Sequence, residues 1–216
     1  MAWLKKLMRL KALLVLCALS ASLAVGQDNE ASGELAKILQ KTTAIRGQFT
    51  QLQYDNNAVL LSESTGQFAM LRPGYFSWRI ETPDSQLIIA TPEFIWHHDI
   101  DLETATRRPV AKAGAMSPLQ ILGGKEELLR ANYTVSKDEE GVFTLVPRSN
   151  STGTSPGFSS LSLNLDNGVL AGMDMIDALN QRVVIHFTQV EHDPPLSPED
   201  FDFTPPTGVD LFYYDQ

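Results

Sequence analysis

The sequence has a single cysteine, Cys17, which lies in an apolar run near the N-terminus. The rest of the chain contains no thiol, and this excludes disulfide bonds, zinc–thiolate sites and cysteine nucleophiles from it. The sequence also lacks the nucleophile elbow G-x-S-x-G, a P-loop and the dinucleotide-binding pattern G-x-G-x-x-G. These absences favour a protein that is not an enzyme.

Histidines are few, and none has the partners that catalysis or metal binding needs. His97 and His98 are adjacent in a predicted strand, so their rings should point to opposite faces of a sheet and cannot share one ion. His186 and His192 have no nucleophile beside them in the sequence. We therefore expect no catalytic residue, no metal and no cofactor.

Basic residues are also scarce, with 17 Lys and Arg against 26 Asp and Glu, a formal charge of −9. Four of these basic residues precede Ala12–Leu19, an apolar run followed by the small residues Ala24-Val25-Gly26, the pattern of a cleaved secretory signal. Residues 1–26 are the expected signal peptide, and 27–216 the expected single domain. Without the signal the charge is −13, which argues against nucleic acid or anionic lipid as a partner.

A predicted β-hairpin dominates the first half of the chain. Pro73-Gly74 suits the centre of a type II turn, and Phe68 and Met70 before it alternate like Phe76, Trp78 and Ile80 after it. Arg72 lies at the tip of this hairpin. Two interpretations are open: a solvated turn arginine, or a guanidinium turned inward to hold backbone carbonyls.

The remaining patterns predict mostly strands. Short helices are expected after the N-cap candidates Ser32 and Ser117, the second interrupted by Gly123-Gly124. Alternating segments continue from residue 133 to residue 187, with Asn167-Gly168 as a strong two-residue hairpin signal. The proline-containing residues 194–206 should be extended and irregular. About eleven antiparallel strands with few helices indicate a barrel, a half-barrel or a sandwich.

The strand faces carry more Phe, Trp and Met than Val and Ile. Few helices are available to cover them, so this bulky surface is either an ordinary core or the lining of a hydrophobic cavity. Methionines suit a cavity that accepts variable acyl shapes, because their unbranched thioether side chains repack easily.

Several stretches, taken in order, resemble the periplasmic outer-membrane lipoprotein carrier family, LolA. They span nearly the whole predicted mature chain and comprise Gly47-Gln48-Phe49-Thr50-Gln51, Arg72-Pro73-Gly74-Tyr75-Phe76-Ser77-Trp78, Leu87-Ile88-Ile89-Ala90, Ile95-Trp96, Ser117-Pro118-Leu119-Gln120-Ile121-Leu122, Phe143-Thr144-Leu145-Val146-Pro147 and Phe201-Asp202-Phe203-Thr204-Pro205-Pro206-Thr207-Gly208-Val209. One departure is Thr91-Pro92-Glu93, which stands where the family has an Asp-Gly turn.

The resemblance implies an open antiparallel half-barrel of about eleven strands covered by a helical lid. It implies a lid latch in which Arg72 bonds backbone carbonyls near Leu39, Leu122 and Gly123. It also implies an acyl-chain cavity, and we expect Phe76, Trp78, Phe94 and Trp96 to share its concave face. The full predicted lining is Phe49, Phe68, Met70, Phe76, Trp78, Ile80, Phe94, Trp96, Leu119, Leu145, Leu163, Met173, Met175 and Ile185.

The function implied is that of a monomeric periplasmic chaperone that shields the acyl chains of lipoproteins. Its implied partners are an inner-membrane ABC-type releasing complex and an outer-membrane receptor lipoprotein. One alternative is that receptor itself, which shares the half-barrel but is anchored through a lipidated cysteine; Leu16, before Cys17, is not the small residue that lipidation needs. The other alternative is a secreted enzyme acting on lipids, which no triad spacing supports.

Overall fold

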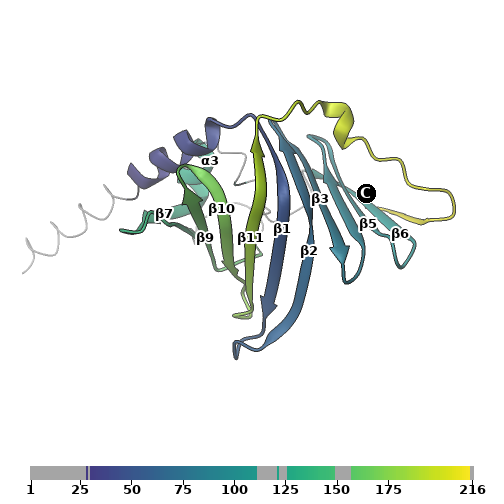
Figure 1. Ribbon diagram of the computed structural model, residues 1–216, viewed down its shortest axis with the longest axis horizontal. Helices are drawn as coiled ribbons and strands as arrows, with labels where there is room; N and C mark the ends of the chain where they lie inside the picture. The colour runs from purple at the N-terminus through teal and green to yellow at the C-terminus, as the bar shows by residue number, and fades with distance from the viewer. Residues whose placement is uncertain (1–27, 29, 111–120, 122–125, 149–156, 215–216) are drawn as a thin grey trace, which may run out of the picture.

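The computed structural model describes residues 28, 30–110, 121, 126–148 and 157–214. Their main feature is one curved sheet of twelve strands in the order β12-β6-β5-β4-β3-β2-β1-β11-β10-β9-β8-β7 (Figure 1). The elements are β1 (Ala44–Tyr54), β2 (Leu60–Leu71), β3 (Tyr75–Thr82), β4 (Gln86–Ala90), β5 (Phe94–Asp99), β6 (Thr104–Pro109), α3 (Glu126–Asn132), β7 (Tyr133–Lys137), β8 (Phe143–Pro147), β9 (Ser160–Asp166), β10 (Val169–Ile176), β11 (Arg182–His192), η2 (Pro198–Phe201) and β12 (Asp210–Tyr213).

The eleven strands β1 to β11 pair antiparallel with one another, as the sequence predicts, and the sheet does not close into a barrel. The twelfth strand was not expected. β12 runs parallel to β6, pairing Asp210 with Thr104, and lies at one end of the sheet, with β7 at the other. The half-barrel prediction is therefore confirmed, with one added edge strand and the short 3-10 helix η2 in a segment predicted to be irregular.

One face of the sheet, the inner face, is defined by residues that lie directly opposite one another on successive strands. Phe68 is opposite Trp78 across β2 and β3, and Phe49 is opposite Phe187 across β1 and β11. Leu163 continues this face from β10 to β8. Opposed residues share a face, so the apolar surface is continuous across most of the sheet.

Helical segments cover the inner face. Residues 30–40 are helical and bury Ala31, Leu35, Ala36 and Leu39, which recur along one stripe of the helix. The helical residue Ile121 and Leu129 of α3 are also buried in the same apolar core. We call helix 30–40, Ile121 and α3 the lid. Figure 1 shows helix 30–40 near β7, β9 and β10 at one end of the molecule.

Irregular pairing bends the central strands. The register between β1 and β11 shifts between Arg46 and Gln48, and Gln189 has a φ of +50° there. A second shift lies between Thr65 and Gly66. A Cβ atom at Gly66 would lie 1.9 Å from the carbonyl oxygen of Arg79, so only glycine fits this irregular pairing of β2 with β3.

The predicted turns form where expected. Asn167 and Gly168 alone join Asp166 to Val169 and have φ values of +52° and +81°, as a type I′ hairpin requires. The β2–β3 hairpin also turns at Pro73-Gly74, but Leu71 pairs with Tyr75, so Arg72, Pro73 and Gly74 form a three-residue loop with Gly74 at a φ of +82°. The unusual turn after Ala90 is also tight, because the amide of Thr91 donates to the carbonyl of Phe94 at 2.9 Å.

An arginine-fastened lid over an apolar inner face

Aromatic rings dominate the centre of the inner face. The rings of Phe49 and Trp78 are stacked with centroids 3.7 Å apart, and Phe68 lies 4.8 Å from Phe187 by the same measure. Trp78 is also close to Phe76, at 6.0 Å between centroids. All five side chains are buried, so the closed protein keeps this aromatic surface out of water.

Eleven of the predicted cavity residues lie together on this face or pack against it. They are Phe49, Phe68, Met70, Phe76, Trp78, Ile80, Leu145, Leu163, Met173, Met175 and Ile185. Leu119 lies outside the described residues.

The prediction for Phe94 and Trp96 is wrong. Trp78 is opposite Ile88, and Ile88 is opposite His97, so the neighbouring residue Trp96 points to the other side of the sheet. We call that side the outer face. Trp96 packs there against Phe203 at 5.3 Å between ring centroids, and the Arg107 guanidinium lies 4.4 Å from the centre of the Phe94 ring. The C-terminal segment, and not the lid, covers this second apolar cluster.

Arg72 holds the C-terminal end of helix 30–40. Its guanidinium donates to the carbonyl of Leu39 at 2.5 Å and to the carbonyl of Thr42 at 2.9 Å. Burial lowers the pKa of Arg72 from its ordinary value. The side chain nevertheless stays charged at neutral pH, because arginine is not deprotonated in proteins. The inward-turned interpretation is therefore correct for the contacts at Leu39. The predicted contacts near Leu122 and Gly123 lie outside the described residues.

A second contact, which sequence reasoning missed, lies at the junction between helix 30–40 and β1. The carboxylate of Asp193 accepts hydrogen bonds from the amides of Thr43 at 2.9 Å and Ala44 at 3.1 Å. These bonds lower the pKa of Asp193, with the bond from Ala44 as the largest cause. No local pattern around Asp193 could have indicated this, because its partners are about 150 residues earlier in the chain.

The space left beside Arg72 is small. A cavity of about 30 Å³ lies among Ile38, Leu39, Ile45, Met70 and Leu170, with Arg72 at its wall. A cavity of that size has room for only a few water molecules and not for an acyl chain. The aromatic residues of the inner face are also buried beneath the lid, so an acyl chain could reach them only if lid side chains moved away.

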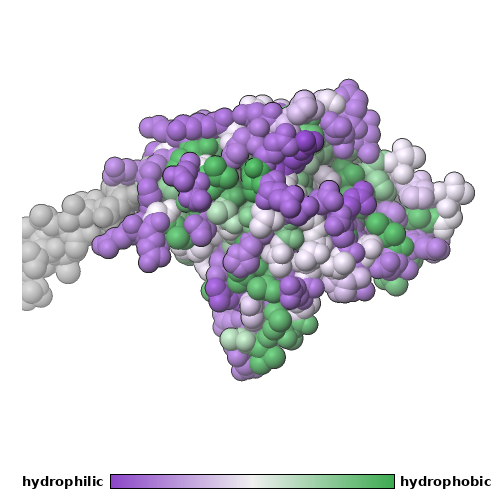
Figure 2. All heavy atoms as spheres, viewed as in Figure 1, coloured by the Kyte–Doolittle hydropathy of each residue, from purple (hydrophilic) through white to green (hydrophobic). Residues whose placement is uncertain are grey.

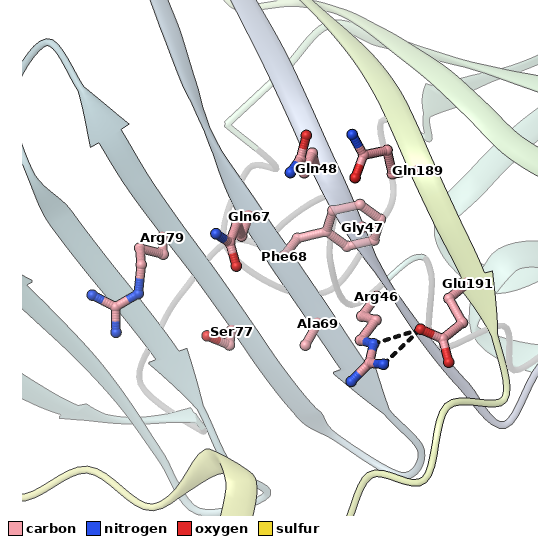
Figure 3. A pocket seen from close by; sticks show the side chains of 10 residues that line it. All are labelled: Arg46, Gly47, Gln48, Gln67, Phe68, Ala69, Ser77, Arg79, Gln189 and Glu191. Atoms are coloured by element: carbon pink, nitrogen blue, oxygen red, sulfur yellow. Dashed lines mark hydrogen bonds and ion pairs between the residues drawn. The ribbon is translucent and has the colours of Figure 1, made fainter.

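A larger groove of about 350 Å³ lies on the outer face and has a different character (Figure 3). Its side chains are mainly polar, and Arg46 is paired with Glu191 at 2.6 Å at one end. Phe68 is its one large apolar lining residue and lies beside Gly47, where a Cβ atom would be 3.0 Å from the Phe68 ring. A polar groove of this kind does not suit acyl chains, so the inner face is the better candidate site.

The two adjacent histidines lie on opposite faces, as strand alternation predicts. His97 is hydrogen-bonded to the Gln86 side chain at 3.2 Å, and burial lowers its pKa. His98 is buried on the outer face near Phe203. Within the described part of the chain, no three His, Cys, Asp or Glu side chains are placed to hold a metal ion. That part also has no helix long and apolar enough to cross a membrane.

Together these features define a class of protein: an open half-barrel whose apolar interior is closed by a fastened helical lid. Two solved structures share the fold at low sequence identity. A conserved protein of Thermus thermophilus aligns with a TM-score of 0.51 and 12% identity, covering 84% of this chain and 98% of that one. A LolA superfamily protein of Nitrosomonas europaea aligns with a TM-score of 0.50 and 12% identity, covering 80% and 98%.

The chain belongs to the family of the outer membrane lipoprotein carrier protein LolA, which it matches over residues 40–204. Its relatives include three proteins named outer-membrane lipoprotein carrier protein. Those of Azotobacter vinelandii and Pseudomonas aeruginosa are each 32% identical, with coverage of 94% and 90% of this chain and 99% and 93% of theirs. That of Coxiella burnetii is 29% identical, covering 87% of this chain and 89% of its own.

Proposed function

We propose that this protein carries lipoproteins by holding their acyl chains against the inner face of the half-barrel. The observation that supports this most directly is the combination of a continuous apolar face and a lid fastened by Arg72. Family membership and the names of the relatives support the same function.

The energetics of the inner face suit reversible loading. Burying an acyl chain gains about 0.8 kcal/mol per methylene, or on the order of 10 kcal/mol for one long chain. The lid already buries Leu35 and Leu39, each worth about 1.5–3 kcal/mol. Cargo must therefore replace contacts that the empty protein already makes, and this reduces the net affinity to a level that permits release.

The finer parts of the proposal follow from this role. The carrier works in the periplasm after residues 1–26 are removed, takes cargo from an inner-membrane ABC-type complex and delivers it to an outer-membrane receptor lipoprotein. It acts as a monomer and catalyses no reaction. The acyl-facing residues are the inner-face set, without Phe94 and Trp96, and Arg72 with the Leu39 carbonyl is the described part of the latch.

A transfer assay tests the proposal. Protein released by osmotic shock should co-purify with lipoprotein and lose it when the receptor is added. Trp78→Asp should abolish co-purification, because an unpaired carboxylate is costly on the buried face. Phe212→Asp is the matched control, since Phe212 lies on β12 and is 49% exposed. Wild-type protein without bound lipoprotein, or a folded Trp78→Asp protein that carries it normally, would contradict the assignment.

A further inference from the structure

The N-terminal end of helix 30–40 is fastened by residues that no sequence pattern indicated. One carboxylate oxygen of Asp28 accepts a hydrogen bond from the amide of Val135 at 2.7 Å. The other oxygen forms an ion pair with the guanidinium of Arg148. Asp28 is thus tied to β7 and to the residue that follows β8.

Arg148 makes backbone contacts that parallel those of Arg72. Its Nε donates to the carbonyl of Tyr133 at 2.9 Å and to the carbonyl of Arg130 at 3.1 Å. The first of these carbonyls starts β7 and the second belongs to α3. One guanidinium therefore joins the sheet edge, α3 and the start of helix 30–40, much as Arg72 joins the β2–β3 hairpin to the end of that helix.

The position of these contacts at the end of the sheet gives them a second role. Among the described residues, β7 pairs with β8 and with no other strand, so its outer edge would otherwise present unpaired backbone groups. Asp28 satisfies one of them at Val135, and the Asp28 side chain is only 15% exposed. Lys137 on the same strand adds an ion pair at 2.7 Å to Glu34, nearly two helical turns after Asp28.

We propose that Arg148 and Asp28 form a second fastening of the lid, opposite the Arg72 latch, and that Arg148 is a positioning residue for lid opening. With both ends held, helix 30–40 can uncover the inner face only when one fastening breaks. The effect of this fastening on cargo exchange rests on the proposed carrier function, whereas its effect on the lid does not.

Spin-label distances in the empty protein test the fastening directly. Because the predicted mature chain, residues 27–216, has no cysteine, label pairs can be introduced at exposed positions without removing any native thiol from it. Glu30→Cys with Ser136→Cys reports on the Arg148 end, and Lys41→Cys with Thr188→Cys reports on the Arg72 end. Arg148→Ala and Asp28→Asn should lengthen and broaden the first distance distribution and leave the second one unchanged.

Two further variants separate the fastening from general destabilisation. Arg148→Lys should restore part of the narrow distribution, because lysine keeps the ion pair with Asp28 but cannot also span two carbonyls. Arg46→Ala is the matched control: it removes an ion pair with Glu191 on the outer face and should change neither distance. Unchanged distributions in both Arg148→Ala and Asp28→Asn, with circular dichroism showing folded protein, would overturn the proposal.

Transfer of lipoprotein to the receptor tests the proposed effect of the fastening on cargo exchange. Arg148→Ala should load lipoprotein but release it more slowly than wild type, as expected when closing the lid contributes less to expelling cargo. A widened lid with wild-type release would overturn the link between this fastening and cargo exchange. If wild-type protein carried no lipoprotein, the carrier function would fail, and the label distances would still decide whether the fastening exists.

Discussion

At the scale of single residues, Arg72 shows how a charged side chain can report on the state of the lid. Its hydrogen bond to the Leu39 carbonyl exists only while the end of helix 30–40 lies against the β2–β3 hairpin, whereas its other described acceptor, Thr42, lies beyond the helix in the link to β1. Hydrogen bonds that involve a charged group contribute about 1.5–3 kcal/mol each. The contribution of the Leu39 bond belongs to the closed state alone and therefore opposes loading.

Replacing Arg72 should consequently affect delivery more than loading. Arg72→Leu should still accept lipoprotein but transfer little of it to the receptor, because the closed state loses its stabilisation. Arg72→Lys should transfer an intermediate amount, since a point charge cannot bond several carbonyls as a planar fork does. The measurement is the fraction of bound lipoprotein handed to the receptor over time. Equal transfer by all three proteins would rule out the latch.

Gly66 should be nearly irreplaceable for a different reason. An alanine Cβ would lie 1.9 Å from the Arg79 carbonyl oxygen and 2.8 Å from the Phe49 ring, so β2 and β3 would have to separate. Gly66→Ala should lower the free energy of unfolding by about 1–3 kcal/mol or more. Gly157→Ala is the control, since a Cβ there meets nothing within 4 Å and should change stability by less than about 1 kcal/mol. Urea denaturation measures the stability of both variants, and equal stabilities would contradict the close approach of Gly66 to the Arg79 carbonyl.

The error at Trp96 shows where sequence reasoning ends at this scale. Alternation identifies which residues of one strand share a face, and it grouped Phe76 with Trp78 correctly. To extend that face to β5, one must know which residues of β4 point to the inner face. The β4 residues Leu87-Ile88-Ile89-Ala90 are apolar on both sides of the strand. Both sides of β4 are covered, one within the inner-face core and the other by the C-terminal segment, so polarity could not reveal which residues point inward.

At the scale of elements, the sequence predicted local turns but not the pairing of strands that are distant in the chain. Asn167-Gly168 predicted its hairpin because two adjacent residues with positive φ suffice to define that turn. β12 has no alternating pattern of burial and pairs in parallel with β6, about a hundred residues earlier. Its existence depends on where the C-terminal segment lies across the outer face, which short-range patterns do not encode.

The junction between helix 30–40 and β1 should depend on pH through Asp193. Hydrogen bonds from Ala44 and Thr43 favour the carboxylate and lower its pKa in the folded protein below the ordinary value of 3.8. The stabilisation is therefore present above the unfolded pKa and is lost as the pH falls through the folded pKa. Neutral pH should show the full effect, and strongly acidic solution none of it.

Asp193→Asn isolates this contribution. Asparagine keeps the shape, still offers an oxygen to the two amides and tolerates the φ of +46° found at this position. Wild type should be more stable than the variant at pH 7, and the difference should shrink as the pH falls below about 4. Urea denaturation at a series of pH values provides the measurement. A stability difference that stays constant down to pH 2 would mean that the Asp193 charge does not support the junction.

At the scale of the whole molecule, the described structure is a closed state with one projecting apolar region outside it. The β1–β2 hairpin extends beyond its neighbours, and the space-filling view shows hydrophobic residues at that tip (Figure 2), where Val59, Leu60 and Leu61 are about half exposed. The large apolar surface is elsewhere, beneath the lid, with only about 30 Å³ free beside Arg72. Cargo that binds beneath the lid, as we propose, should therefore change the lid and leave the sheet intact.

Hydrogen exchange can test that division of the molecule. The central strands β1, β2 and β11 are paired on both sides and hold the aromatic centre, so their amides should stay protected with or without cargo. Helix 30–40 is held mainly by its buried stripe and by polar contacts at its two ends, and lipoprotein should displace that stripe. Protection in residues 30–40 should therefore fall on loading. If their exchange slowed or stayed the same while lipoprotein was bound, acyl chains would have to lie somewhere other than beneath the lid.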